Sequence, residues 1–217
     1  MTSMDSARTL MVEAQVRTND VTDPRIIDAM SRLPRERFVP AAKQHLAYSD
    51  ACVELSAGRY LLDPRSFAKL AQLAGITDQD RVLDVACGMG YSTIVLAAMA
   101  KEVVGLEELA PLADEASRAV REFGDGRAKV VTGPLTDGYP AAGPYDVIFI
   151  NGAVETLPDS YPSQLREGGR LVAIFHQGPV GKAHFCVQRG GALSHRVAFD
   201  ATVPVLHRFV RASAFVF

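Results

Sequence analysis

The sequence predicts an α/β fold: a doubly wound, mostly parallel sheet with antiparallel strands at its C-terminal end and helices at its N-terminal end. Three observations support this prediction. From residue 81 onward, short apolar runs of strand type alternate with segments of helical period. The first of these strands leads into a glycine turn and then a helix. After residue 175 the alternation gives way to two runs separated by Arg189, Gly190 and Gly191, the pattern of a hairpin.

Composition limits the class of protein. The 217 residues, 48% of them hydrophobic, suffice for one domain with a full core. Within it we expect a helical N-terminal segment (residues 1–75) packed on a core of residues 76–217. The net charge of −2 gives no electrostatic footprint for nucleic acid. No apolar run approaches the roughly 20 residues that span a membrane. Three widely spaced cysteines and a polar N-terminus predict a cytoplasmic protein, and the oligomeric state stays open.

The N-terminal segment carries three helix signals. Residues 10–16 have an apolar and a polar face. Asp23 followed by Pro24 is typical of an N-cap and a first helical residue, and Pro34 ends that helix. A third helix is expected to begin at Pro64 and to end before Gly75.

The core is predicted as a series of strands and helices. Ser92 is the expected N-cap of its first helix, and Gly168 with Gly169 is the expected turn into its fifth strand. The expected strands are residues 82–86, 103–106, 128–131, 147–150 and 170–175, then a hairpin of 183–188 and 194–199 and a last strand of 212–217. The expected helices are residues 92–100, 111–123 and a short one at 160–166.

The glycine turn is the main functional signal. Residues 84–90 read D-V-A-C-G-M-G, and Gly88 and Gly90 permit a tight turn and a close backbone approach to a ligand. About 20 residues later the next strand ends on Glu107, where dinucleotide-binding folds place the acid that takes ribose hydroxyls. The alternative interpretation of Glu107 is a solvated acid at the end of a strand. The turn lacks the third glycine of the dinucleotide fingerprint, and its D-x-x-x-G-x-G form instead resembles the signature of S-adenosylmethionine-dependent methyltransferases.

Further stretches resemble protein L-isoaspartate O-methyltransferases, over most of the chain up to about residue 175. The most specific of them is the Pro-Arg-x-x-Phe-Val-Pro segment from Pro34 to Pro40. The others are residues 11–17, 23–30, 47–50, 143–150 and 164–172. The resemblance implies a Rossmann-like methyltransferase fold, S-adenosylmethionine as methyl donor and S-adenosylhomocysteine as product. It also implies protein repair, in which the methyl acceptor is an isoaspartyl carboxylate of a damaged protein.

The resemblance also implies the site residues. The cofactor contacts it implies are Tyr60, Asp84, Gly88, Met89, Gly90, Glu107, Glu108 and Leu135. The weaker substrate candidates are Arg59, Leu62 and Arg65, of which the two arginines are cations for a substrate carboxylate. No catalytic residue is expected, because a carboxylate is already ionised at neutral pH and the protein need only align the reactants, an effect worth up to roughly 7–11 kcal/mol. The five histidines lack metal-like spacing, so no metal is expected.

Two departures from the family pattern leave the substrate open. The family's Gly-x-Thr-Ile-Ser-x-Pro run, whose serine meets the substrate carboxylate, has Tyr60 for threonine and Leu62 for serine. The family aspartate that holds the adenine amine is replaced by Pro134. We therefore expect weakened cofactor binding and low isoaspartyl activity. The alternatives are a divergent methyltransferase acting on another peptide or small-molecule carboxylate, and a cofactor-binding pseudoenzyme that serves as a regulatory module.

Overall fold

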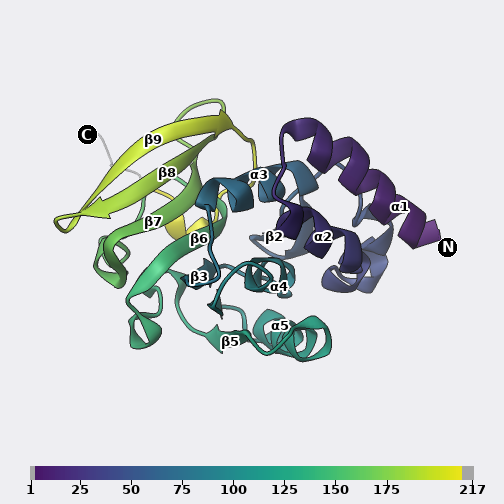
Figure 1. The fold of residues 1–217 in the computed structure, drawn as a ribbon, viewed down its shortest axis with the longest axis horizontal. Coiled ribbons are helices and arrows are strands. Elements are labelled where there is room, and N and C mark those ends of the chain that lie inside the picture. Colours follow the sequence, from purple (N-terminus) through teal and green to yellow (C-terminus); the bar gives the residue numbers. More distant parts are fainter. Residues whose placement is uncertain (1–2, 212–217) are drawn as a thin grey trace, which may run out of the picture.

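The computed structural model describes residues 3–211, which form a seven-stranded sheet with helices packed beside it (Figure 1). The strand order is β5-β4-β3-β6-β7-β8-β9. Strands β3 to β7 run parallel to one another, whereas β8 is antiparallel to β7 and β9 is antiparallel to β8. The strands are β3 (Arg81–Val85), β4 (Glu102–Glu107), β5 (Ala128–Thr132), β6 (Tyr145–Val154), β7 (Leu165–Phe175), β8 (Lys182–Arg189) and β9 (Ala192–Asp200). The predicted mixed sheet is confirmed, and the predicted strand 212–217 lies outside the described residues.

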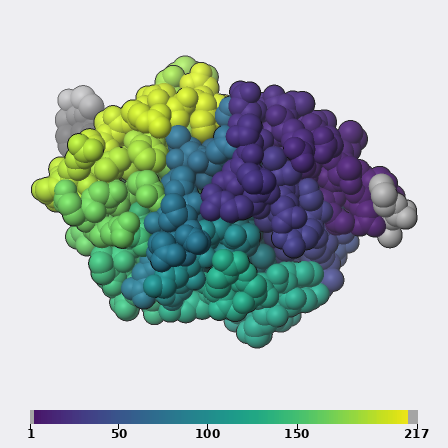
Figure 2. Space-filling model, in the orientation of Figure 1, coloured from purple at the N-terminus to yellow at the C-terminus, as the bar shows by residue number. Residues whose placement is uncertain are grey.

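The two faces of the sheet are covered differently. The helices α1 to α5 contribute to the core on one face, whereas the other face packs against short 3-10 turns and the segment after β9. In the space-filling view the N-terminal residues and the last strands lie at opposite ends of one surface (Figure 2). The helices are α1 (Ser3–Met11), α2 (Pro24–Arg32), α3 (Pro64–Ala74), α4 (Tyr91–Ala97) and α5 (Ala110–Phe123). Within residues 3–211, no helix has the length and apolar character needed to cross a membrane.

Helices α2 and α3 begin and end where the sequence predicts, whereas the predicted helical stretch at residues 10–16 consists of the end of α1 and a π-helical turn, Val12–Val16. Asp23 caps α2 by accepting a hydrogen bond from the Arg25 amide at 2.9 Å. Asp63 caps α3 in the same way, through the Ser66 amide at 2.8 Å. Gly75 ends α3 in the left-handed region, with φ 57°. Each cap satisfies a backbone group that the helix itself leaves unpaired.

Three local predictions were wrong. Ser92 does not cap α4, because Gly90 takes φ 91° and starts the helix one residue after itself, while the Ser92 hydroxyl donates to Asp84 at 2.7 Å. The predicted helix at residues 160–166 is a single 3-10 turn, Pro162–Gln164. Strand β7 begins directly after it, so Gly168 and Gly169 lie in an irregular stretch within the strand, not before it.

A hairpin that the sequence analysis did not predict stands apart from the main sheet. Strands β1 (Val53–Ser56) and β2 (Arg59–Leu61) form a separate antiparallel two-stranded sheet. Its register is irregular between Glu54 and Ser56. This hairpin carries the run in which the family pattern changes, and it reaches the carboxyl ends of β3 and β4.

Candidate cofactor site at the carboxyl ends of β3 and β4

The turn after β3 is built from residues in the left-handed region. Ala86, Gly88 and Gly90 have φ of 60°, 57° and 91°. A Cβ on Gly90 would lie 3.1 Å from the Cα of Ala116 in α5, so close packing as well as conformation requires a glycine there. Ala86 takes this conformation with a side chain, at a cost of about 1–2 kcal/mol. Backbone strain therefore lies within the predicted cofactor turn.

Glu107, at the end of β4, is fully buried, so it is not a solvated acid. Its Oε1 accepts from Arg59 Nε at 3.0 Å and from the amides of Glu108 and Leu109 at 2.8 and 3.0 Å. Its Oε2 accepts from the Gly88 amide at 3.0 Å. A carboxylate has about four lone-pair positions. Three donors therefore crowd Oε1, whereas Oε2 holds one donor and keeps one acceptor position open.

Arg59 brings the predicted cofactor and substrate residues into one cluster. Its side chain is 1% exposed and its Nη2 donates to Glu108 Oε2 at 3.1 Å. Glu108 also pairs with exposed Arg208 at 3.0 Å. We call Arg59, Glu107, Glu108 and Arg208 the Arg59 cluster. The structure thus places Arg59 against two carboxylates of the cofactor site, where it does not face a substrate carboxylate.

Asp84 is the second buried carboxylate of the site. Its Oδ2 accepts from the hydroxyls of Ser92 at 2.7 Å and Thr93 at 2.6 Å. Its Oδ1 accepts from the side-chain amide of Asn151, on β6. Burial raises the pKa of Asp84 to about 7; the three hydrogen bonds oppose this rise and the charge of Glu107 adds to it.

Asn151 was missed as a site residue by the sequence analysis. The available signal was its place directly after the predicted strand 147–150, which ends at the same edge of the sheet.

Cys87, inside the turn, is buried, and burial with the charges of Asp84 and Glu107 raises the pKa of its thiol well above 9.0. A thiol in that state is a poor nucleophile, consistent with a packing role.

The hairpin fills the space in front of the turn. A Cβ on Gly88 would lie 2.6 Å from Leu55 Cδ1, so the close approach that this glycine permits is made by the hairpin itself. The cavity that remains here, lined by Leu55, Tyr60, Leu62 and Asn151 among others, measures about 10 Å³. That is room for about one water, whereas ligand pockets measure roughly 300–1,000 Å³. The polar groups have the chemistry to hold a nucleoside, and the hairpin lies so close to the turn that the cavity between them has room for about one water.

The remaining predicted residues have varied surroundings. Leu62 is buried at the edge of the small cavity, and Leu135 is a buried residue of the 3-10 turn that follows β5. Tyr60 and Met89 are half-buried. Arg65 donates to Asn19 Oδ1 at 2.9 Å, so it contacts the N-terminal segment and not the Arg59 cluster.

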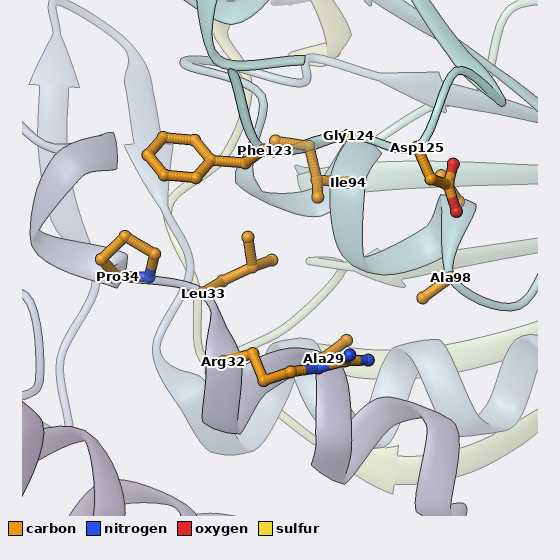
Figure 3. Close-up of a pocket in the computed structure, with 10 residues that line it drawn as sticks. Ala29, Arg32, Leu33, Pro34, Ile94, Ala98, Phe123, Gly124 and Asp125 are labelled. Atoms are coloured by element: carbon orange, nitrogen blue, oxygen red, sulfur yellow. The ribbon is translucent and has the colours of Figure 1, made fainter. Parts of the chain in front are cut away.

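A larger cavity, of about 310 Å³, lies between α2, α4 and α5 (Figure 3). It is bordered by the C-terminal end of α4, far from the glycine turn at its N-terminal end. The charged groups at its edge are already paired, Arg32 with Asp28 and Asp125 with Arg127. Over the described residues, no group of three or more potential metal ligands meets. The cavity between α2, α4 and α5 therefore offers no unpaired charged group to a ligand, and the carboxyl ends of β3 and β4 remain the candidate site.

The sheet order, the glycine turn after β3 and the acid at the end of β4 define the class: a Rossmann-like α/β protein of the methyltransferase type. Residues 6–196 match the family model described as protein-L-isoaspartate(D-aspartate) O-methyltransferase. The chain therefore belongs to the protein-L-isoaspartate O-methyltransferase family.

Curated relatives agree with this assignment. A protein-L-isoaspartate O-methyltransferase of Rhodopseudomonas palustris is 38% identical over 162 residues, which cover 75% of this chain and 74% of the relative. A protein of the same name from Erwinia tasmaniensis is 32% identical over 207 residues, 95% of this chain and 96% of the relative. The second alignment covers almost the whole chain.

Two solved structures share the fold. One is a protein-L-isoaspartate O-methyltransferase with a TM-score of 0.77 and 24% identity, and the match covers 91% of this chain and 65% of that one. The other, from Plasmodium falciparum, is described as a β-aspartate methyltransferase (PCMT) in complex with S-adenosyl-L-homocysteine. Its TM-score is 0.76 at 18% identity, over 96% of this chain and 100% of that one.

Proposed function

We propose that this chain is an S-adenosylmethionine-dependent methyltransferase that methylates a carboxylate, by family membership that of an isoaspartyl residue in a damaged protein. The observation that carries the proposal is the joining of the glycine turn to the acid of the next strand, through the hydrogen bond from the Gly88 amide to Glu107. Asp84 and Asn151 complete the polar lining at the same edge of the sheet. The Plasmodium relative supports the identity of the cofactor.

The isoaspartyl reaction is proposed to be slow in this chain. Leu62 is buried and presents no hydroxyl where the family has its serine. A hydrogen bond to a charged group contributes about 1.5–3 kcal/mol, which corresponds to about 10- to 100-fold in rate. Another peptide or small-molecule carboxylate is therefore an alternative acceptor within the same reaction class.

A second candidate is a cofactor-binding regulatory module without methyltransferase activity. The observation that favours it is buried Leu62, which offers no hydroxyl to a substrate carboxylate at the family's serine position. A module of this kind would keep cofactor binding and lack transfer to any peptide. The two candidates differ in one measurable property, the formation of a methyl ester.

The experiment is a transfer assay with radiolabelled S-adenosylmethionine and paired peptides that differ only in isoaspartate against aspartate. Base-labile label on the isoaspartyl peptide alone supports the methyltransferase. Calorimetric titration with S-adenosylhomocysteine is run on the same protein, with Glu107→Gln as the matched variant. Binding that falls in the variant, without label on either peptide or on small carboxylates, supports the regulatory module, and absence of binding contradicts both candidates.

We extend the proposal to location and partners on the sequence evidence. Three widely spaced cysteines suit a reducing compartment, so we propose the cytoplasm. A peptide or protein segment bearing a carboxylate is the proposed partner. The near-neutral net charge offers no support for nucleic acid as a second partner.

A further inference from the structure

We infer that Arg59 competes with the cofactor for Glu107, and that the β1–β2 hairpin must move away before the cofactor binds. The inference rests on the proposed function and concerns the same site. It gives Arg59, at a position the family pattern leaves variable, the task of setting the affinity and the rate of cofactor binding. Three features of the structure support it: the donors on Glu107, the construction of the hairpin and the second carboxylate of the Arg59 cluster.

The donors on Glu107 differ in whether they can leave. Three of them are backbone amides, of Gly88, Glu108 and Leu109, which the turn and the start of α5 hold in place. The fourth is the Arg59 side chain, at 3.0 Å. A pair of ribose hydroxyls needs acceptor positions on this carboxylate. Oε2 already has one open position, and displacement of Arg59 is the step that frees a position on Oε1 for the second hydroxyl without disrupting the turn.

The hairpin is a unit separate from the main sheet. Its strands have four and three residues and form a sheet of their own. A two-stranded hairpin is at best marginally stable in isolation. Arg59 pairs with Ser56 across the hairpin, next to Leu55, so a displacement that withdraws the guanidinium also withdraws the leucine from Gly88. One movement thus opens both the acid and the turn.

Glu108 gives the displaced cation a partner. It is half-buried at the rim of the site and already accepts from both Arg59 and Arg208. A buried arginine that lost every carboxylate would be costly. Because Glu108 stays within its reach, Arg59 can leave Glu107 without becoming an unpaired buried charge. The Arg59 cluster therefore supports a closed and an open arrangement.

The test is calorimetric titration of the full chain with S-adenosylhomocysteine. Arg59→Gln removes the competing cation, and we expect its dissociation constant to be about 10- to 100-fold lower than that of the unmodified protein. Leu55→Ala removes the side chain that covers Gly88 and is expected to tighten binding in the same direction. The matched control is Arg170→Gln, which removes a partly buried arginine ion pair with Asp80 far from the turn and leaves the dissociation constant within about twofold.

Association kinetics provide a second readout. With hairpin opening as a prior step, the observed rate for the unmodified protein reaches a plateau as ligand is raised, whereas Arg59→Gln stays linear over the same range. Equal or weaker binding by Arg59→Gln, with normal binding by the unmodified protein, overturns the inference and leaves the proposed function intact. If Arg59→Gln does not fold, Leu55→Ala decides: tighter binding supports the inference and unchanged binding overturns it. Absence of binding in every folded variant overturns the proposed function together with the inference.

Discussion

The substitution Asp84→Asn tests whether burial or hydrogen bonding decides the ionisation of the carboxylate beneath the glycine turn. The substitution keeps the shape of the side chain and removes its charge. The new amide oxygen accepts from Asn151, and the new NH2 group donates to the hydroxyls of Ser92 and Thr93, which rotate to accept. The three contacts therefore survive, and the variant isolates the effect of ionisation.

The magnitude follows from the shifted pKa. The pKa of Asp84 rises from 3.8 to about 7 because the group is fully buried. Between these values the folded chain holds a proton that the unfolded chain releases, so the free energy of unfolding falls as pH rises. The stabilisation from this proton is complete below pH 4 and lost as pH rises through about 7. Three pKa units correspond to about 4 kcal/mol in the free energy of unfolding. The variant is neutral at every pH and therefore does not lose this stabilisation.

Urea unfolding of both proteins between pH 4 and 8 measures this difference. We expect the free energies of unfolding to agree at pH 4, and the Asp84→Asn protein to be more stable by up to about 4 kcal/mol at pH 8. Asp80→Asn, at the other end of β3, serves as a control for the loss of a different buried aspartate. Parallel pH profiles for the unmodified protein and Asp84→Asn would refute the reasoning, because they would show that the three donors keep Asp84 ionised throughout this range.

Three further predictions concern the turn, the adenine loop and the substrate position. Ala86→Gly should raise the free energy of unfolding by about 1 kcal/mol in urea titrations, since relief of about 1–2 kcal/mol of strain exceeds the added entropy of the unfolded chain; a lower midpoint would contradict this. Pro134→Asp should tighten S-adenosylhomocysteine binding about tenfold by supplying an acceptor to the adenine amine, and weaker binding would show that the loop follows another path. Tyr60→Thr combined with Leu62→Ser should raise isoaspartyl methylation about 10- to 100-fold, whereas robust methylation by the unmodified protein would remove the need for the serine.

The sequence predicted those parts of the fold whose signals are local. Strand β3 follows from an apolar run bounded by a turn, and α2 and α3 follow from Asp-Pro caps at their first residues. The β1–β2 hairpin was missed because strands of four and three residues carry too few alternations to be recognised. The short helix at 160–166 was wrong because the chain there enters β7 directly.

The candidate site, like the fold, was predictable only where its signals are local. The glycine turn and Glu107 were located from spacing along the chain, and their hydrogen bond is in the structure. The partners that complete the site come from distant segments: Asn151 lies 67 residues from Asp84, and Arg208 lies 100 residues from Glu108. Nothing in the local sequence marks such pairs. The roles assigned to the individual site residues stay predictions until cofactor and peptide binding are measured.

Arg35, in the family-specific motif, supports the backbone at residue 62, and this support explains why Leu62 can be exchanged for serine without displacing the chain. Arg35, from the Pro-Arg-x-x-Phe-Val-Pro segment, is fully buried and donates to the carbonyls of Ala47 and Leu62. Its guanidinium carbon lies 4.8 Å from the ring centroid of Tyr91, the first residue of α4. Arg35 therefore holds the backbone at residue 62 against the helix that follows the glycine turn, through contacts that do not involve the side chain of residue 62. Because this support is backbone-directed, exchange of the leucine for serine changes the chemistry presented to a substrate while the position of the backbone is kept.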